Sequence, residues 1–175
     1  MSNRLYLAYG SNLNVAQMSM RCPTATVFGR AEHEGYRLVY KGSKTGSYLT
    51  IDKAPGCKVP VAVWSVTACD EEALDRYEGH PTFYRKENIR IKVDRGRRGR
   101  KPVVDAFIYI MNGHEYGLPT SHYVKVCSVG YSQFGFDTKY LDEALEYTKE
   151  QIREQKSNPS GWWPWYAEYG RWFTH

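Results

Sequence analysis

The first two thirds of the chain consists largely of short apolar runs separated by turn residues, a pattern typical of β-strands. The predicted strands span residues 4–9, 36–40, 47–52, 59–66, 83–93 and 103–111. In the run at 83–93, isoleucine and valine alternate with charged residues, which indicates one buried and one solvated face. The run at 103–111 is apolar at most positions, and the Arg/Gly-rich turn between these two runs predicts a β-hairpin.

Four segments carry helix signals, and the predicted helices span residues 14–21, 70–79, 121–134 and 137–156. Asn14, Asp70 and Asp137 are suited to cap helices, and Gly79 is a typical helix-ending residue. Apolar residues recur at helical spacing in the last segment. Because strands mostly precede helices, the order predicts an α+β domain with a curved sheet or barrel.

The helix predicted at 70–79 carries a candidate catalytic residue. Leu74 and Glu78 are four residues apart, so their side chains share one face of the helix. If Leu74 packs inward, Glu78 is drawn toward the core, and partial burial raises the pKa of a carboxyl group. The alternative is a solvated glutamate at the end of a surface helix.

The turn after the first strand is a second candidate. Gly10 can adopt backbone angles closed to other residues, and Ser11 and Asn12 are typical turn and helix-cap residues. A turn that leads into a helix leaves free N–H donors, which suit an anion or a carboxylate. The alternative is a structural turn that binds nothing.

Composition indicates one ordinary globular domain. The chain has 175 residues, of which 42% are hydrophobic and 25% charged. No apolar run reaches the roughly 20 residues that span a bilayer, and the N-terminus lacks the layout of a signal peptide, so we expect a cytoplasmic protein without membrane association. The four cysteines form no CxxC pair and the histidines share no metal spacing, so we expect free thiols and no metal site.

The C-terminal segment differs from the rest of the chain. After Pro159 and Gly161, which should end the preceding helix, four tryptophans and other aromatic residues follow. A segment with so many aromatic side chains should be buried against other protein surface and not exposed to water. We therefore predict a domain at 1–156 and an aromatic-rich tail at 157–175 that packs on the domain or on a partner subunit.

The positive charge is concentrated in one stretch. Residues 85–101 carry nine Lys/Arg against two acidic residues, or +7, so the remainder of the +5 chain carries −2. A solvated hairpin tip explains such a run, and the alternative is a non-enzymatic nucleic-acid-binding module that uses the basic hairpin at 94–101. Residues 42–45 resemble the end of a phosphate-binding loop, but the first glycine at the required spacing is missing, so we do not expect nucleotide binding there.

Two motifs together resemble the γ-glutamylcyclotransferase family. The first is Tyr6-Leu7-Ala8-Tyr9-Gly10-Ser11-Asn12-Leu13, and the second is Leu74-Asp75-Arg76-Tyr77-Glu78-Gly79, followed by Phe83 and Tyr84. The resemblance covers about residues 4–148 and does not reach the aromatic tail. It implies an α+β fold with a mixed β-barrel and flanking helices.

The resemblance also implies a site and a reaction. Glu78 matches the general acid/base position, and the substrate-binding positions correspond to Tyr6, Leu7, Ala8, Tyr9, Gly10, Ser11, Asn12, Tyr84 and Tyr123. The amine of a γ-glutamyl group would attack its own γ-carbonyl and release 5-oxoproline and a free amine, with no metal or cofactor.

Members of the family differ in the amine that they release. A γ-glutamyl amino acid, γ-glutamyl-ε-lysine or another γ-glutamylamine would all fit the shared motifs, so the choice stays open. Homodimers are known in such families, and the aromatic tail could supply an interface.

Overall fold

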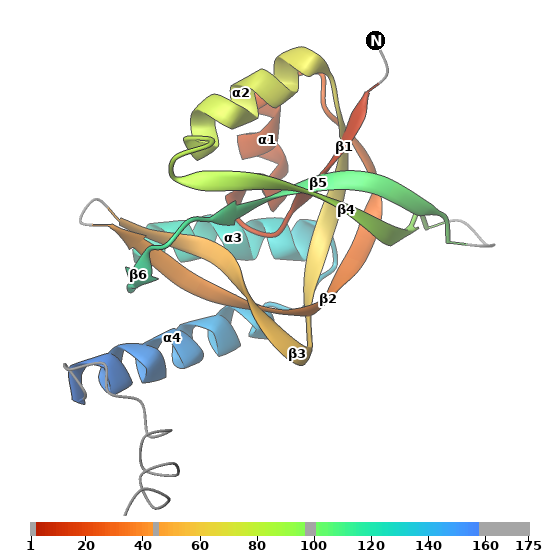
Figure 1. The fold of residues 1–175 in the computed structure, drawn as a ribbon. Coiled ribbons are helices and arrows are strands. Elements are labelled where there is room, and N and C mark those ends of the chain that lie inside the picture. Colours follow the sequence, from red (N-terminus) through yellow and green to blue (C-terminus); the bar gives the residue numbers. More distant parts are fainter. Residues whose placement is uncertain (1–2, 44–45, 97–100, 158–175) are drawn as a thin grey trace, which may run out of the picture.

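Within the described part of the chain, five strands close a mixed β-barrel (Figure 1). The structure, a computed structural model, describes residues 3–43, 46–96 and 101–157. The barrel strands are β1 (Arg4–Ala8), β2 (Thr26–Ser43), β3 (Gly46–Val66), β4 (Tyr84–Asp94) and β5 (Val103–Met111). They follow the order β3-β1-β5-β4-β2, and β2 pairs back with β3 to close the barrel. β1 and β5 are parallel, whereas the other barrel pairs are antiparallel.

Helices flank this barrel, as predicted. They are a 3₁₀ turn η1 (Ser11–Leu13), α1 (Val15–Arg21), α2 (Ala68–Glu78), α3 (Ser121–Gln133) and α4 (Lys139–Ser157). A short strand β6 (Glu115–Tyr116) pairs antiparallel with the end of β2. In Figure 1, α1 and α2 lie together at one end of the barrel, and α4 lies at the opposite end against β2. None of these helices is both long and apolar enough to cross a membrane.

The two longest strands are more continuous than the sequence pattern predicted. β2 begins at residue 26, and the runs predicted separately at 47–52 and 59–66 belong to the single strand β3. The strands pair antiparallel along their length, with two register shifts. Gly35 and Gly56 have positive φ angles of 81° and 83°. In a sequence such glycines are typical of turns between strands, but here they lie within β2 and β3, at bends of the hairpin.

The start of α2 corrects one predicted cap. Thr67, and not Asp70, is the N-cap residue, and Asp70 lies at the third helical position and completes a capping box. The Asp70 carboxylate accepts hydrogen bonds from the Thr67 amide at 3.0 Å and from the Thr24 hydroxyl at 2.6 Å. Burial alone would raise the pKa of Asp70, but these hydrogen bonds outweigh it and lower the pKa. Gly79 ends the helix in the left-handed conformation, as predicted.

A close backbone contact joins α3 to the turn after β1. A Cβ atom at Gly130 would lie 2.6 Å from the Asn14 amide nitrogen and 2.7 Å from the Leu13 carbonyl carbon. Leu13 itself is fully buried. Only a residue without a side chain lets α3 pack this closely, and the contact fixes the position of η1 from behind.

Replacing Gly130 with alanine should therefore lower the free energy of unfolding by about 1–3 kcal/mol, as overpacking against backbone generally does. Chemical denaturation measures this loss as a lower midpoint at unchanged slope. Val129→Ala, at an exposed position of the same helix, is the matched control and should change stability by less than about 0.5 kcal/mol. Equal midpoints for Gly130→Ala and the wild type would show that α3 can move away without cost.

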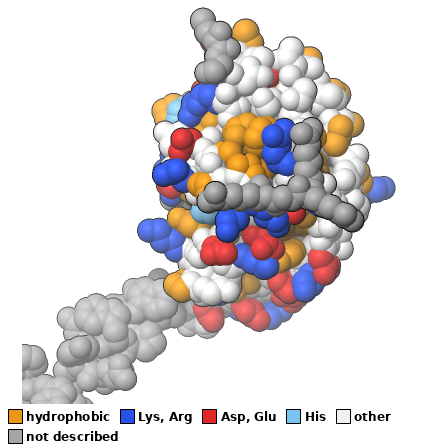
Figure 2. All heavy atoms as spheres, turned by 90° about the vertical axis from the view of Figure 1, so that its right-hand side faces the viewer, with side chains coloured by type: hydrophobic (Ala, Val, Ile, Leu, Met, Phe, Trp, Pro, Cys, Tyr) orange, Lys and Arg blue, Asp and Glu red, His pale blue; other side chains and the backbone are white. Residues whose placement is uncertain are grey.

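The basic hairpin predicted at 94–101 is described only at its ends, because residues 97–100 lie outside the described part. The Arg95 guanidinium lies 4.5 Å from the centre of the Phe28 ring, and the Lys101 ammonium lies 3.0 Å from the Asp94 carboxylate. Figure 2 shows Lys and Arg side chains interspersed with Asp and Glu on this side of the molecule. Nucleic-acid binding stays a prediction.

The aromatic tail beyond Ser157 also lies outside the described residues. Its packing on the domain or on a partner, and the homodimer to which it could contribute, likewise stay predictions.

Candidate active site

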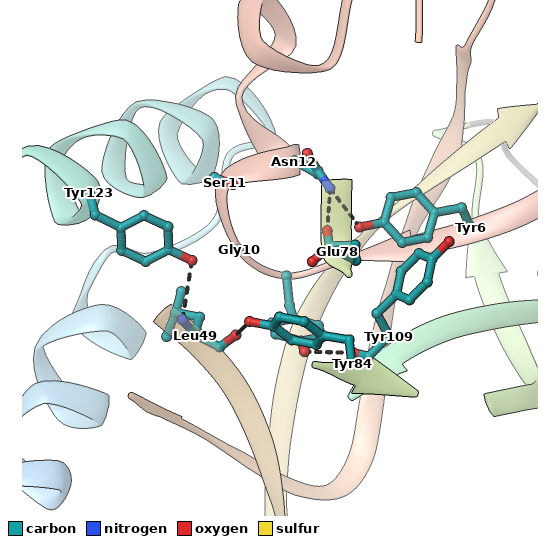
Figure 3. Close-up of a pocket in the computed structure, with 10 residues that line it drawn as sticks. Tyr6, Gly10, Ser11, Asn12, Leu49, Glu78, Tyr84, Tyr109 and Tyr123 are labelled. Carbon is teal, nitrogen blue, oxygen red and sulfur yellow. Dashed lines mark hydrogen bonds between the residues drawn. The ribbon is translucent and has the colours of Figure 1, made fainter. Parts of the chain in front are cut away.

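A cavity opens where η1, the end of α2 and the edge of β3 meet (Figure 3). Its volume is about 310 Å³, part of it open to solvent. The lining residues are Tyr6, Tyr9, Gly10, Ser11, Asn12, Leu49, Glu78, Tyr84, Tyr109 and Tyr123. Five of the ten are tyrosines, which give the cavity apolar walls with polar tips.

Glu78 is the one acidic residue among the residues that line the cavity. It is the last residue of α2, one turn after the fully buried Leu74, so the predicted inward face is confirmed. Its Oε1 accepts a hydrogen bond of 2.9 Å from the Asn12 amide nitrogen. Burial raises the pKa of Glu78 to about 7, against the opposing effects of the Arg21 charge and of the Asn12 hydrogen bond. The group can therefore both accept and donate a proton near neutral pH.

A hydrogen-bonded chain behind the cavity holds the Glu78 carboxylate in place. The Asn12 amide nitrogen, besides contacting Glu78, donates to the Tyr6 hydroxyl oxygen at 2.9 Å. The Asn12 amide oxygen accepts from the Arg21 guanidinium. Because a guanidinium only donates, this contact directs the NH₂ group of Asn12 toward Glu78. Arg21 is itself held by Tyr77, whose ring lies 3.7 Å from the guanidinium carbon and whose hydroxyl accepts a hydrogen bond of 2.7 Å.

The edge of β3 forms the opposite wall. The Leu49 carbonyl accepts a hydrogen bond of 2.9 Å from the Tyr84 hydroxyl, and the Leu49 amide donates one of 3.1 Å to the Tyr123 hydroxyl oxygen. Burial raises the pKa of both tyrosines well above its usual value, so both hydroxyls keep their protons. Since Tyr123 accepts from Leu49, its own hydrogen can be donated to a ligand oxygen in the cavity.

The turn at Gly10 brings a further set of donors to the site. A Cβ atom at Gly10 would lie 3.1 Å from the Tyr123 hydroxyl oxygen, so a larger residue would crowd the cavity wall. The first hydrogen bond inside the turn runs from the Leu13 amide to the Gly10 carbonyl, at 3.0 Å. The amides of Ser11 and Asn12 precede that bond and have no partner within the turn, which suits a carboxylate or an oxyanion.

The structure brings together most of the residues singled out in the sequence. Glu78 and seven of the predicted substrate-binding residues line the cavity: Tyr6, Tyr9, Gly10, Ser11, Asn12, Tyr84 and Tyr123. Leu7 and Ala8 do not belong to this lining. Both are buried in the barrel, where Leu7 pairs with Val63 of β3 and Ile108 of β5. Side chains alternate along a strand, so Leu7 points away from the side that Tyr6 occupies.

Sequence reasoning missed three residues that shape the site. Tyr109 and Leu49 line the cavity, and Arg21 orients Asn12 from outside it. Barrel closure brings Tyr109 and Leu49 to the site, and a linear sequence carries little signal of that contact. Arg21 lies in the last turn of α1, where a basic residue is common for reasons of the helix dipole alone.

Within the described residues, no three His, Cys, Asp or Glu side chains come together in a way that could hold a metal ion. The four cysteines carry free thiols, as predicted.

Comparison with known sequences identifies the family. A profile of the family described as "Gamma-glutamyl cyclotransferase, AIG2-like" matches residues 6–128. The chain is 27% identical over 147 residues to a human protein named "Gamma-glutamylcyclotransferase", covering 79% of this chain and 76% of the human one. A bovine protein of the same name is 28% identical over 144 residues, covering 78% and 74% of the two chains.

Solved structures agree. A structure named "Gamma-glutamyl cyclotransferase" superimposes with a TM-score of 0.71 at 25% identity, covering 81% of this chain and 86% of that one. The crystal structure of the uncharacterized human protein loc79017 superimposes with a TM-score of 0.69 at 26% identity, covering 87% and 88%. The fold and these matches place the chain in a class of small cyclotransferase-type proteins. The chain belongs to the γ-glutamyl cyclotransferase, AIG2-like family.

Proposed function

We propose that the protein cyclises the γ-glutamyl group of a γ-glutamylamine, releasing 5-oxoproline and the free amine, with Glu78 as general acid and base. The observation that carries the proposal is the half-buried Glu78 carboxyl, which lines the cavity and whose pKa is raised to about 7 by burial. A carboxyl with an ordinary pKa would be too weak a base for an ammonium group at neutral pH.

The proton balance explains why one carboxyl is enough. The substrate arrives with an α-ammonium group, and Glu78 takes one proton from it to free the nitrogen lone pair. The amine attacks the γ-carbonyl carbon, a C–N bond forms, and the five-membered tetrahedral intermediate carries its negative charge on oxygen. Glu78 then gives a proton to the leaving nitrogen as the original amide bond breaks. The second proton lost by the attacking nitrogen goes to solvent or to the released amine.

Binding supplies much of the remaining rate. The attacking and attacked atoms belong to one molecule, so the site has only to hold the glutamyl chain in its folded conformation. The amides of Ser11 and Asn12 are donors suited to the α-carboxylate or to the developing oxyanion, and the Tyr123 hydroxyl is a further donor. In this mechanism the substrate supplies the nucleophile and the protein chain supplies the proton carrier and the hydrogen-bond donors, so the proposed reaction uses no metal or cofactor.

A panel of γ-glutamyl amino acids and γ-glutamylamines, incubated with the purified protein, tests the proposal. Chromatographic measurement should show 5-oxoproline and the free amine in equal amounts, with no cofactor added. Release from no member of the panel would overturn the proposal.

A further inference from the structure

A second, wider cavity adjoins the first. It is lined by Ser11, Tyr48, Arg76, Tyr77, Glu78, Gly79, Phe83, Tyr84 and Tyr123. Four of these residues, Ser11, Glu78, Tyr84 and Tyr123, also line the inner cavity, so the two form one continuous space with Glu78 at their junction. We call this second space the outer cavity.

The junction determines what each cavity can hold. In the proposed cyclisation, Glu78 must reach both the α-nitrogen and the leaving nitrogen, so the scissile amide lies beside its carboxyl. The inner cavity, with its ring of tyrosines and the Ser11 and Asn12 amides, then holds the glutamyl group. The leaving amine extends from the same amide in the other direction, which places it in the outer cavity.

The side chains of the outer cavity have a distinct chemistry. Arg76 is exposed in the last turn of α2, and among the described residues its guanidinium takes part in no hydrogen bond or ion pair. The aromatic rings of Tyr48, Tyr77 and Phe83 complete the walls, and Tyr48 and Tyr77 are 36% and 49% exposed. An exposed cation beside exposed aromatic surface is suited to a ligand with one carboxylate and one flat or apolar group.

Resting on the proposed cyclisation, we propose that the outer cavity binds the leaving amine and that Arg76 selects amines bearing a carboxylate next to an aromatic or apolar side chain. A guanidinium can bind a carboxylate through two parallel hydrogen bonds, which a single point charge does not match in geometry. The same charge disfavours leaving amines that carry a second cation, such as a diamine.

The test compares two substrates that differ by one carboxylate, γ-glutamylphenylalanine and γ-glutamylphenethylamine. We expect the wild type to show a higher kcat/KM for the first by about fivefold, the size expected of one exposed ion pair. In Arg76→Gln this preference should fall to near one, with the change mainly in KM. In Arg76→Glu it should reverse and extend to a preference for γ-glutamylputrescine. The preference is a ratio within one variant, so partial unfolding does not alter it.

Arg90→Gln is the matched control, because Arg90 is an exposed arginine on β4 outside both cavities. It should keep the wild-type preference. An equal kcat/KM for the two substrates in the wild type, or an unchanged preference in Arg76→Gln, would overturn the role of Arg76 and leave the cyclisation standing. Absence of 5-oxoproline from every substrate would instead overturn the proposed function and this inference with it.

The contact between the aromatic walls of the outer cavity and the leaving group can be tested separately. Tyr48→Ala removes an exposed ring from the outer cavity, so the preference for γ-glutamylphenylalanine over γ-glutamylglycine should fall severalfold, while the effect of the carboxylate remains. An unchanged preference would show that the aromatic walls do not contact the leaving group.

Discussion

Glu78→Gln should fold normally and release 5-oxoproline about 10²–10⁴-fold more slowly than the wild type, the range that general acid–base catalysis usually contributes. Glutamine keeps the size of the side chain and can still accept the hydrogen bond from Asn12. It cannot take a proton from the substrate ammonium group or return one to the leaving nitrogen. Steady-state release of the free amine from a γ-glutamyl dipeptide measures the loss.

Stability provides the control for folding. The pKa of Glu78 lies above its ordinary value of 4.5 in the folded protein, at about 7. Between these two values the folded state holds the proton more tightly than the unfolded state, so stability falls as pH rises through this range. Above pH 7 the ionised, half-buried carboxylate lowers the stability of the folded wild type by its full amount. The glutamine variant lacks this charge and should therefore be at least as stable as the wild type. Near-wild-type turnover in this folded variant would contradict the role of Glu78.

The pH dependence of kcat/KM should follow the Glu78 carboxyl of the free enzyme. Because the base must be ionised, kcat/KM should rise tenfold per pH unit up to about pH 7 and then level off. At pH 5 the value should be about 100-fold below the plateau. Initial rates at low substrate concentration across pH 5–8 measure this profile.

Asn12 supplies the matched variant for that profile. Asn12→Ala removes the donor that stabilises the carboxylate, so the rise in kcat/KM should move to higher pH. Asn12→Asp adds a like charge beside Glu78 and should move it further. A profile that is flat between pH 5 and 7 in the wild type, or that stays in place in both variants, would show that another group controls the rate.

Local sequence signals predicted the part of the site that depends on one helix and one turn. The four-residue spacing of Leu74 and Glu78 placed the carboxyl on the buried face, and Gly79 placed it at the end of the helix. The Gly10 turn and the Asn14 cap were also recognisable, because both are local signals: a glycine-containing turn follows the first strand, and the Asn14 side chain caps α1 by accepting a hydrogen bond from the Gln17 amide.

The parts that were missed depend on contacts between distant segments. Leu49 reaches the cavity because the β2–β3 hairpin curls round to close the barrel, and Tyr109 because β5 pairs with β1. Glycines at 35 and 56 interrupt the apolar pattern within that hairpin, so one long strand resembled two short ones. Leu7 and Ala8 were included with their neighbours in the motif, although the two-residue period of a strand already turns Leu7 away from Tyr6.

In the proposed reaction the attacking group is the substrate's own amine and not water. The most direct measurement is mass spectrometry of the products formed from a γ-glutamyl dipeptide in H₂¹⁸O. Intramolecular attack predicts 5-oxoproline without ¹⁸O, in a one-to-one ratio with the released amine, and no glutamate. Glutamate carrying one ¹⁸O atom in its γ-carboxyl group would show that the site activates water, and would contradict intramolecular cyclisation.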